Sequence, residues 1–191
     1  MRGRELIYTS ERGEWRAWLT AHFETAREVW FVFPTAASGE RGLSYNDAVE
    51  EALCFGWIDS TQKEIGGVMM QRFSPRAKNG HWTELNKERV RRLERMGLMT
   101  DAGRAVLPPM GPRSFRIDPE IASALKAARV WSRFRAFPPL YQRVRAGNLA
   151  FYKTRDRQTY ERMLARLIEE TKRNHMYGAW DDYGRLSESC E

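Results

Sequence analysis

The stretch "FGWIDSTQKEIGGVMMQRFS", residues 55–74, decides the fold of this chain. Two runs with strand character flank Gly66-Gly67, a pair that suits the type I′ turn of a two-residue β-hairpin. A turn this tight would set Ile65 opposite Val68 and fix the register of the two strands. The sequence therefore predicts an antiparallel hairpin at the centre of the fold.

The register of this hairpin gives the first functional hint. Thr61 would lie opposite Arg72, and because side chains alternate between the faces of a strand, Asp59 and Arg72 would be diagonal neighbours on one face. A carboxylate that follows so apolar a segment needs a partner, so we expect Asp59 to pair with Arg72 or Arg76. We also expect Gly56 to be required, since a side chain there would crowd the turn from helix to strand.

Helix and strand patterns alternate around the hairpin. An aromatic, β-branched run over residues 28–33 predicts a further strand. Apolar spacing and capping residues predict helices over 10–23 behind Ser10, from Ser44 to Gly56, over 82–96, from Thr100, from Asp118 and over 155–172. These patterns indicate an α+β fold, with a small antiparallel sheet of about three strands packed with helices and then a helical C-terminal unit.

The proline-rich stretch "LPPMGP", residues 107–112, is the clearest boundary in the chain. We expect an α+β domain over residues 1–112 and a basic helical unit over 113–174. Residues 175–191 show no apolar periodicity and are expected to form a frayed tail.

The formal net charge of +7 comes from the C-terminal part of the chain. Residues 113–173 hold 15 basic and 6 acidic side chains, whereas residues 1–112 hold 16 and 15. Such asymmetry permits a nucleic-acid partner. The alternative is a solvated, arginine-rich helical face, which we favour because no nucleic-acid-binding module is recognisable.

The composition suits a compact cytoplasmic protein. Hydrophobic residues make up 42% of the 191 residues, and no run approaches the roughly 20 apolar residues of a membrane span. The N-terminal residues lack the apolar core of a signal peptide. Cys54 and Cys190 suggest no disulfide framework.

No pattern for metal, cofactor or nucleophilic chemistry stands out. The histidines at 22, 81 and 175 match no metal-ligand spacing, and no phosphate-binding loop or nucleophile elbow occurs. Cys54 lies at the apolar end of a predicted helix, where a buried, inert thiol is the better interpretation than a nucleophile. We therefore expect no cofactor, no metal and no catalytic residue, and a binding protein rather than an enzyme.

One cluster of polar and aromatic residues is a candidate ligand site. Arginine offers a planar fork for an anion and tryptophan a stacking wall. The members, on the hairpin and on the segment after it, are Trp57, Asp59, Lys63, Arg72, Arg76, Trp82 and Asn86. The partner would be a small polar or anionic ligand or another protein. The alternatives are a structural ion pair that orients the hairpin, and an enzyme of unknown reaction at the same cluster.

Four stretches carry a resemblance to a known family. They are "LSYNDAVEEALCFGWIDS" (43–60), "MQRFSPR" (70–76), "HWTELNKERVRRL" (81–93) and "MTDAG" (99–103). They resemble the YdeI/OmpD-associated family, also called bacteriocin-protection proteins, over roughly residues 14–105, and residues 117–172 resemble its C-terminal helical unit more loosely.

The resemblance implies an α+β domain followed by helices, and a role in stress or antimicrobial resistance. Two positions depart from the family pattern. Ser74 replaces the usual threonine, and Gly66-Gly67 replaces a longer, acidic hairpin tip, which would alter the mouth of a site on that face.

Overall fold

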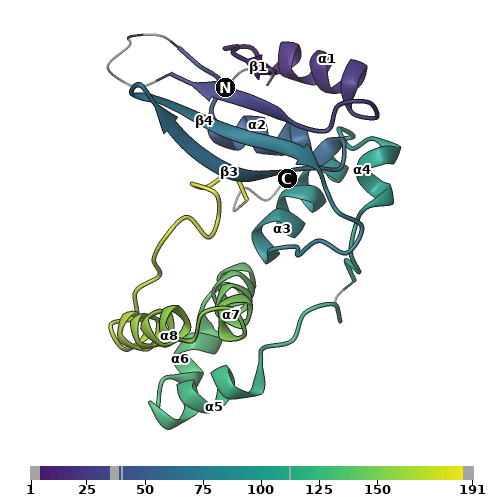
Figure 1. Ribbon diagram of the computed structural model, residues 1–191. Helices are drawn as coiled ribbons and strands as arrows, with labels where there is room; N and C mark the ends of the chain where they lie inside the picture. Colours follow the sequence, from purple (N-terminus) through teal and green to yellow (C-terminus); the bar gives the residue numbers. More distant parts are fainter. Residues whose placement is uncertain (1–4, 35–38, 40, 112, 187–191) are drawn as a thin grey trace. The chain divides into compact units, whose positions relative to one another are not determined.

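The chain divides into two compact units (Figure 1). The computed structural model describes residues 5–34, 39, 41–111 and 113–186. The first unit comprises residues 1–81 and 90–108, and the second comprises residues 82–89 and 109–191. Each unit has its own core.

The first unit contains a four-stranded sheet in the order β1-β2-β4-β3. Its strands are β1 (Leu6–Ile7), β2 (Val29–Phe33), β3 (Trp57–Ile65) and β4 (Val68–Pro75). The pairs β2–β4 and β3–β4 are antiparallel, whereas β1 pairs with β2 in parallel. The predicted α+β class is confirmed, but the sheet is mixed and has one more strand than expected, because two residues are too few for a strand pattern.

The hairpin has the predicted tip and a different base. Ile65 lies opposite Val68 as expected, but a β-bulge between Asp59 and Gln62 shifts the pairing, so that Asp59 lies opposite Phe73. Directly opposed residues share a face. Asp59 therefore lies on the face of Phe73, Arg72 lies on the other face, and the predicted diagonal pair of Asp59 with Arg72 is wrong.

Helix α1 (Arg12–His22) packs on the face of the sheet that carries Phe73. The Trp15 ring lies 5.3 Å from the Phe31 ring and 5.5 Å from the Phe73 ring, centroid to centroid. Ser10 is not the N-cap of α1, since Glu11 occupies that position without a side-chain cap. Thr9 instead accepts a hydrogen bond from the Glu11 amide at 2.9 Å.

Helix α2 (Tyr45–Cys54) begins as the sequence predicts, with the Ser44 hydroxyl accepting from the Asp47 amide. Helices α3 (Glu84–Arg95) and α4 (Asp101–Ala105) follow. The Cys54 carbonyl at the end of α2 accepts from both the amide and the hydroxyl of Thr100. Gly56 has φ +74°, and a Cβ there would lie 3.0 Å from a backbone oxygen of α4, so glycine is required at this turn.

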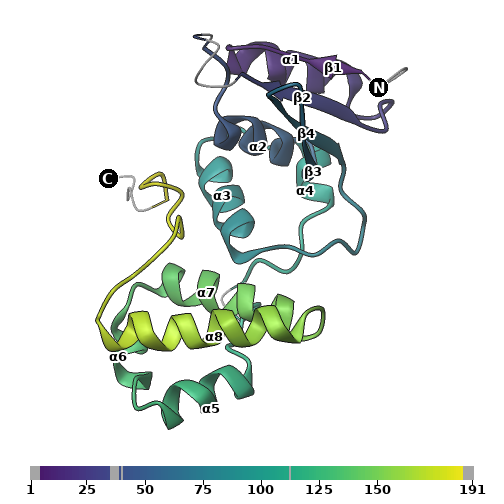
Figure 2. The same cartoon turned by 60° about the vertical axis from the view of Figure 1, so that its left-hand side comes forward.

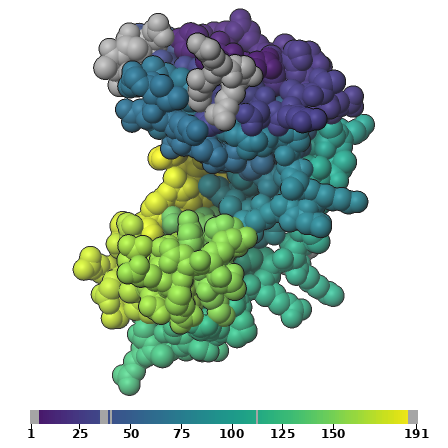
Figure 3. All heavy atoms as spheres, in the orientation of Figure 1, coloured from purple at the N-terminus to yellow at the C-terminus, as the bar shows by residue number. Residues whose placement is uncertain are grey.

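The second unit is helical in its described part and contains α5 (Pro119–Ala127), α6 (Trp131–Ala136), α7 (Pro139–Lys153) and α8 (Arg157–Lys172). Asp118 caps α5 as predicted. Helix α7 lies beside α8 (Figure 2), and it begins at Pro139, because proline is accommodated at the first position of a helix. The two helices make up much of the visible face of this unit in Figure 3.

Residues 176–186 differ from the expected frayed tail. Met176, Tyr177 and Trp180 pack against the core of the second unit. Asp182 is 1% exposed, and both of its carboxylate oxygens accept from Arg89, at 2.8 and 2.9 Å. A buried, bidentate ion pair and aromatic packing hold this segment without apolar periodicity. Residues 187–191, with Cys190, lie outside the described part of the chain.

Among the described residues, no helix has the length and apolar character that crossing a membrane would require.

Candidate functional site: an arginine-lined cavity in the second unit

The predicted hairpin cluster does not form around an Asp59–Arg72 pair. Asp59 accepts a hydrogen bond of 2.6 Å from the Tyr45 hydroxyl. Arg72 donates from Nε to Glu28 at 2.6 Å and from Nη1 to the Ser60 hydroxyl at 3.2 Å. The bulge separates the two side chains, and each has a partner on its own face.

Arg76 is buried and donates from Nη1 to the His81 carbonyl at 2.9 Å. Burial lowers the pKa of its guanidinium to about 10, and the negative charge of Asp59 counteracts part of this lowering. Asp59 therefore acts on Arg76 through its charge, while its hydrogen bond goes to Tyr45.

The aromatic and lysine members of the cluster have separate environments. Trp57 is 1% exposed and donates from its indole nitrogen to the Phe23 carbonyl, so it belongs to the core of the first unit. Lys63 is exposed, with its ammonium 5.3 Å from the centre of the Trp30 ring. Trp57 thus contributes to the packing of the first unit, and Lys63 makes a cation–π contact with Trp30.

The last two members, Trp82 and Asn86, belong to the second unit. Asn86 is buried, and its side-chain oxygen accepts from Arg89 at 3.0 Å. It thus supports the Arg89–Asp182 ion pair. The seven predicted residues are divided between two units, and neither unit holds the cluster as one site.

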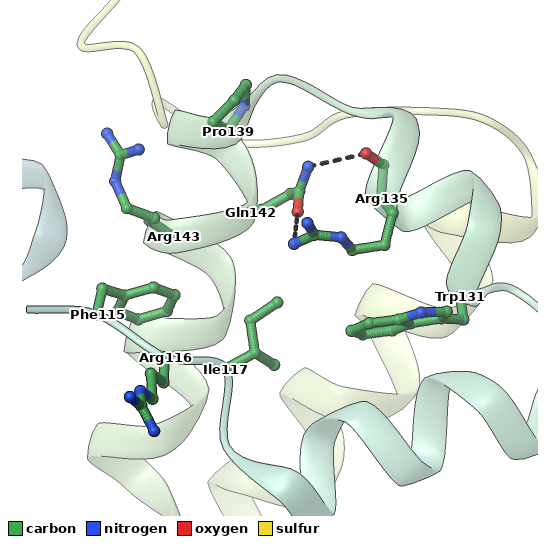
Figure 4. Close-up of a pocket in the computed structure, with 8 residues that line it drawn as sticks. All are labelled: Phe115, Arg116, Ile117, Trp131, Arg135, Pro139, Gln142 and Arg143. Atoms are coloured by element: carbon green, nitrogen blue, oxygen red, sulfur yellow. Dashed lines mark hydrogen bonds between the residues drawn. The ribbon is translucent and has the colours of Figure 1, made fainter. Parts of the chain in front are cut away.

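The second unit instead contains a cavity of about 400 Å³, called the Arg135 cavity below. This size is within the range of small-molecule sites. Three segments form it: the loop before α5, helix α6 and the first turn of α7 (Figure 4). Its lining residues are Phe115, Arg116, Ile117, Trp131, Arg135, Pro139, Gln142 and Arg143.

A hydrogen-bonded amide holds the Arg135 guanidinium in the cavity. Gln142 is 6% exposed, and its Nε2 donates to the carbonyls of Arg135 and Phe137, at 3.1 and 2.7 Å. These two bonds fix the orientation of the amide, so that Oε1 must face Arg135. Arg135 Nη1 donates to Oε1 at 2.8 Å, as Figure 4 shows.

The three arginines of the cavity differ in how their charges are compensated. Arg143 donates from Nη2 to Glu88 at 2.9 Å, and its Nε lies 3.8 Å from Glu84. Within the described part of the chain, no acidic side chain forms an ion pair with Arg116 or Arg135. The cavity therefore carries two positive charges without an acidic partner.

The rest of the wall is apolar. Ile117 lies between Phe115 and Trp131 in Figure 4, and it packs against the core of the second unit. Two cations make cation–π contacts with the Trp131 ring, Lys126 Nζ at 5.4 Å and Arg135 Cζ at 5.8 Å from its centre. Helix α7 starts at the cavity wall with Pro139, and the dipole of this 15-residue helix adds positive potential there.

The sequence interpretation missed this site because it treated the basic segment as a solvated face. A usable signal was present: aromatic and arginine side chains alternate at Phe115-Arg116 and recur as Trp131 and Arg135, one helical turn apart.

No group of His, Cys, Asp and Glu side chains suited to a metal ion occurs among the described residues. As predicted, Cys54 is buried, and burial raises the pKa of its thiol to about 11.

Comparison with known proteins gives one match. Residues 7–106 match the family described as Domain of unknown function (DUF8412). No curated protein and no solved structure matches the chain. The resemblance to the YdeI/OmpD-associated family is therefore wrong, since the matched family is a different one, and the expected role in stress or antimicrobial resistance loses its support.

Proposed function

The chain belongs to the family described as Domain of unknown function (DUF8412), and we propose that it binds a small organic anion in the Arg135 cavity. The family match ends at residue 106, before the residues that line the cavity. The proposal therefore rests on the geometry of the second unit.

One observation carries the proposal: a neutral amide, and no carboxylate, fixes the Arg135 guanidinium at the cavity. Arg135 is exposed, so water solvates its charge and its stability needs no acidic partner. Gln142 orients the guanidinium and leaves the charge uncompensated. A cation prepared in this way favours an anionic ligand, whose binding requires no reorganisation of the side chain.

The sequence pointed to the same ligand class at another place. A small polar or anionic ligand was expected at Asp59, Arg72 and Trp82, but Asp59 and Arg72 are on opposite faces of the sheet. We therefore move the site to the Arg135 cavity. The expected alternatives, a protein partner or an enzyme at the hairpin, have no contact in the described residues that favours them.

A nucleic-acid surface is less well supported by the basic segment. Several of its cations are engaged by acids of the same unit, such as Lys153 with Asp118 at 2.9 Å and Arg157 with Glu120 at 2.9 Å. Arg145 and Arg133 donate to backbone carbonyls. Nucleic-acid-binding proteins contact phosphates with lysine and arginine side chains. In this chain those side chains would first have to be released from the contacts just described.

The test is binding of small anions to wild type and to Arg135→Gln. Acetate, benzoate, inorganic phosphate and phenyl phosphate are titrated while thermal stability and the Trp131 indole N–H resonance are followed. We expect at least one anion to raise the melting temperature saturably, since a ligand that binds only the folded state stabilises it. The same anion should shift the Trp131 resonance and lose both effects in Arg135→Gln.

The matched control is Arg162→Gln, which removes the same charge from an exposed position of α8 in the same unit. Anion binding should survive this change. If Arg135→Gln binds every anion as wild type does, or if no anion moves the Trp131 resonance, the Arg135 cavity is not an anion site.

A further inference from the structure

We infer that the anion is an aromatic carboxylate, whose two oxygens accept hydrogen bonds from Nε and Nη2 of Arg135. This inference rests on the proposed function and names the ligand class of the same site.

The hydrogen bonds of Arg135 decide which edge faces a ligand. Gln142 Oε1 accepts a hydrogen bond from Arg135 Nη1 at 2.8 Å. Within the described residues, no protein acceptor occupies Nε or Nη2 of Arg135. These two nitrogens form the side-on fork that matches the two oxygens of a carboxylate, with two parallel hydrogen bonds. One fixed fork suits one carboxylate.

The charges around the cavity disfavour a more highly charged group. Arg143 is compensated by Glu88 at 2.9 Å, with Glu84 within 4 Å of its Nε. Glu84 also pairs with Lys87 at 2.7 Å, so these two acids and two cations add no net charge beside the cavity. Arg116 and Arg135 are both exposed, but within the described residues no hydrogen bond fixes the Arg116 side chain. A dianionic phosphate would therefore find a single guanidinium that a hydrogen bond holds in place.

The apolar wall selects the body of the ligand. Ile117, Phe115 and Trp131 line the part of the cavity opposite the Gln142–Arg135 hydrogen bond in Figure 4. Two aromatic side chains favour a ring over an aliphatic chain, because paired rings attract each other beyond the effect of the buried area. A volume of about 400 Å³ is near the lower end of the range for small-molecule sites, which suits one or two rings.

Gln142 is the positioning residue of this site. Its two bonds to backbone carbonyls fix its amide, and the amide in turn selects the edge of Arg135 that remains available. The fork is thus prepared before the ligand arrives. Loss of this arrangement should weaken binding even where the charge of Arg135 is kept.

Four probes separate the features of the ligand. Benzoate carries ring and carboxylate, benzamide carries the ring without charge, acetate carries the carboxylate without ring, and phenyl phosphate carries the ring with a phosphate. Dissociation constants come from the Trp131 indole shift, which reports millimolar binding. We expect benzoate to bind at least about tenfold more tightly than each of the other three, a difference of about 1.4 kcal/mol.

Arg135→Lys tests the fork against charge alone, because lysine keeps the charge and loses the planar pair of donors. It should weaken benzoate at least about tenfold, whereas Arg162→Lys, on α8, should leave the affinity unchanged. Equal affinity of benzoate for Arg135→Lys and wild type would overturn the fork and leave the anion site standing.

The remaining outcomes are also distinct. Phenyl phosphate that binds as tightly as benzoate would overturn the carboxylate assignment, and acetate that does so would overturn the ring. Absence of benzoate binding overturns this inference whatever the other probes do. Only if no anion binds through Arg135 does the proposed function fail with it.

Discussion

Two adjacent glutamates of α2 lie fully inside the first unit and depend on arginines from other helices. Glu50 has 0% exposed side chain, and its two carboxylate oxygens accept from Arg12 Nη1 and from Arg92 Nη1, each at 3.0 Å. Glu51 is 2% exposed and pairs with Arg12 and Arg16. These contacts tie α1 and residues 90–95 of α3 to α2.

We predict that Glu50→Ala destabilises the first unit by about 3 kcal/mol. The variant loses two hydrogen bonds to a charged group, worth roughly 1.5–3 kcal/mol each. Removing one partner of a buried pair also leaves uncompensated cations, and such changes cost about 3–5 kcal/mol. The side chains of Arg12 and Arg92 are 32% and 22% exposed, so both can regain water, which places the expected loss at the lower end.

The assay is urea unfolding followed by circular dichroism and tryptophan fluorescence, with coincidence of the two signals checked because two units can unfold separately. The matched control is Glu94→Ala. Glu94 also accepts two bonds from an arginine, Arg104, at 2.8 and 3.0 Å, but both side chains are more than a third exposed. Exposed pairs contribute little, so the control should lie close to wild type. Equal, small losses in both variants would refute the reasoning from burial.

Three further predictions concern the second unit and the thiol. Gln142→Glu should abolish anion binding, because a carboxylate at this position would compensate Arg135; benzoate titration followed at the Trp131 indole checks this, and unchanged affinity would contradict it. Burial acts to raise the pKa of Asp118, but hydrogen bonds from Lys153 and the Glu120 amide lower it below the ordinary 3.8. A lowered folded-state pKa gives stability that is present above pH 3.8 and lost as the pH falls through the folded value. Wild type should therefore exceed Asp118→Asn in urea midpoint at pH 7 and converge with it below pH 3.8; a constant gap would contradict this. Cys54, with a thiol pKa of about 11, should react with a thiol reagent at pH 8 far more slowly in folded than in urea-unfolded Cys190→Ser protein, and equal rates would contradict its burial.

Local rules were enough for the ends of several elements. The tip at Gly66-Gly67, the Ser44 cap and the Asp118 cap each depend on a few adjacent residues, so the printed sequence predicts them. The α+β class follows from the same patterns. These features form because the backbone conformations and the first-turn amides are satisfied by neighbours in the chain.

The faces of the hairpin could not be predicted in this way. Whether Asp59 shares a face with Arg72 depends on one extra residue in β3. The bulge turns Trp57 and Asp59 of β3 to the face of Phe73, where the Trp57 ring lies 5.8 Å from the Trp18 ring of α1. A bulge reverses every side chain on one side of it, so a contact made at long range decided what the local alternation could not.

The sequence by itself determined the Gly66-Gly67 turn, the Ser44 and Asp118 caps and the excess of arginine after residue 112. The tertiary structure alone decided which arginines are compensated and which line a cavity. Arg143 and Arg135 lie eight residues apart in one basic segment. Packing gives Arg143 two acids from α3 and gives Arg135 a neutral amide. Charge compensation depends on distances between side chains from different elements, and the order of residues along the chain does not specify those distances.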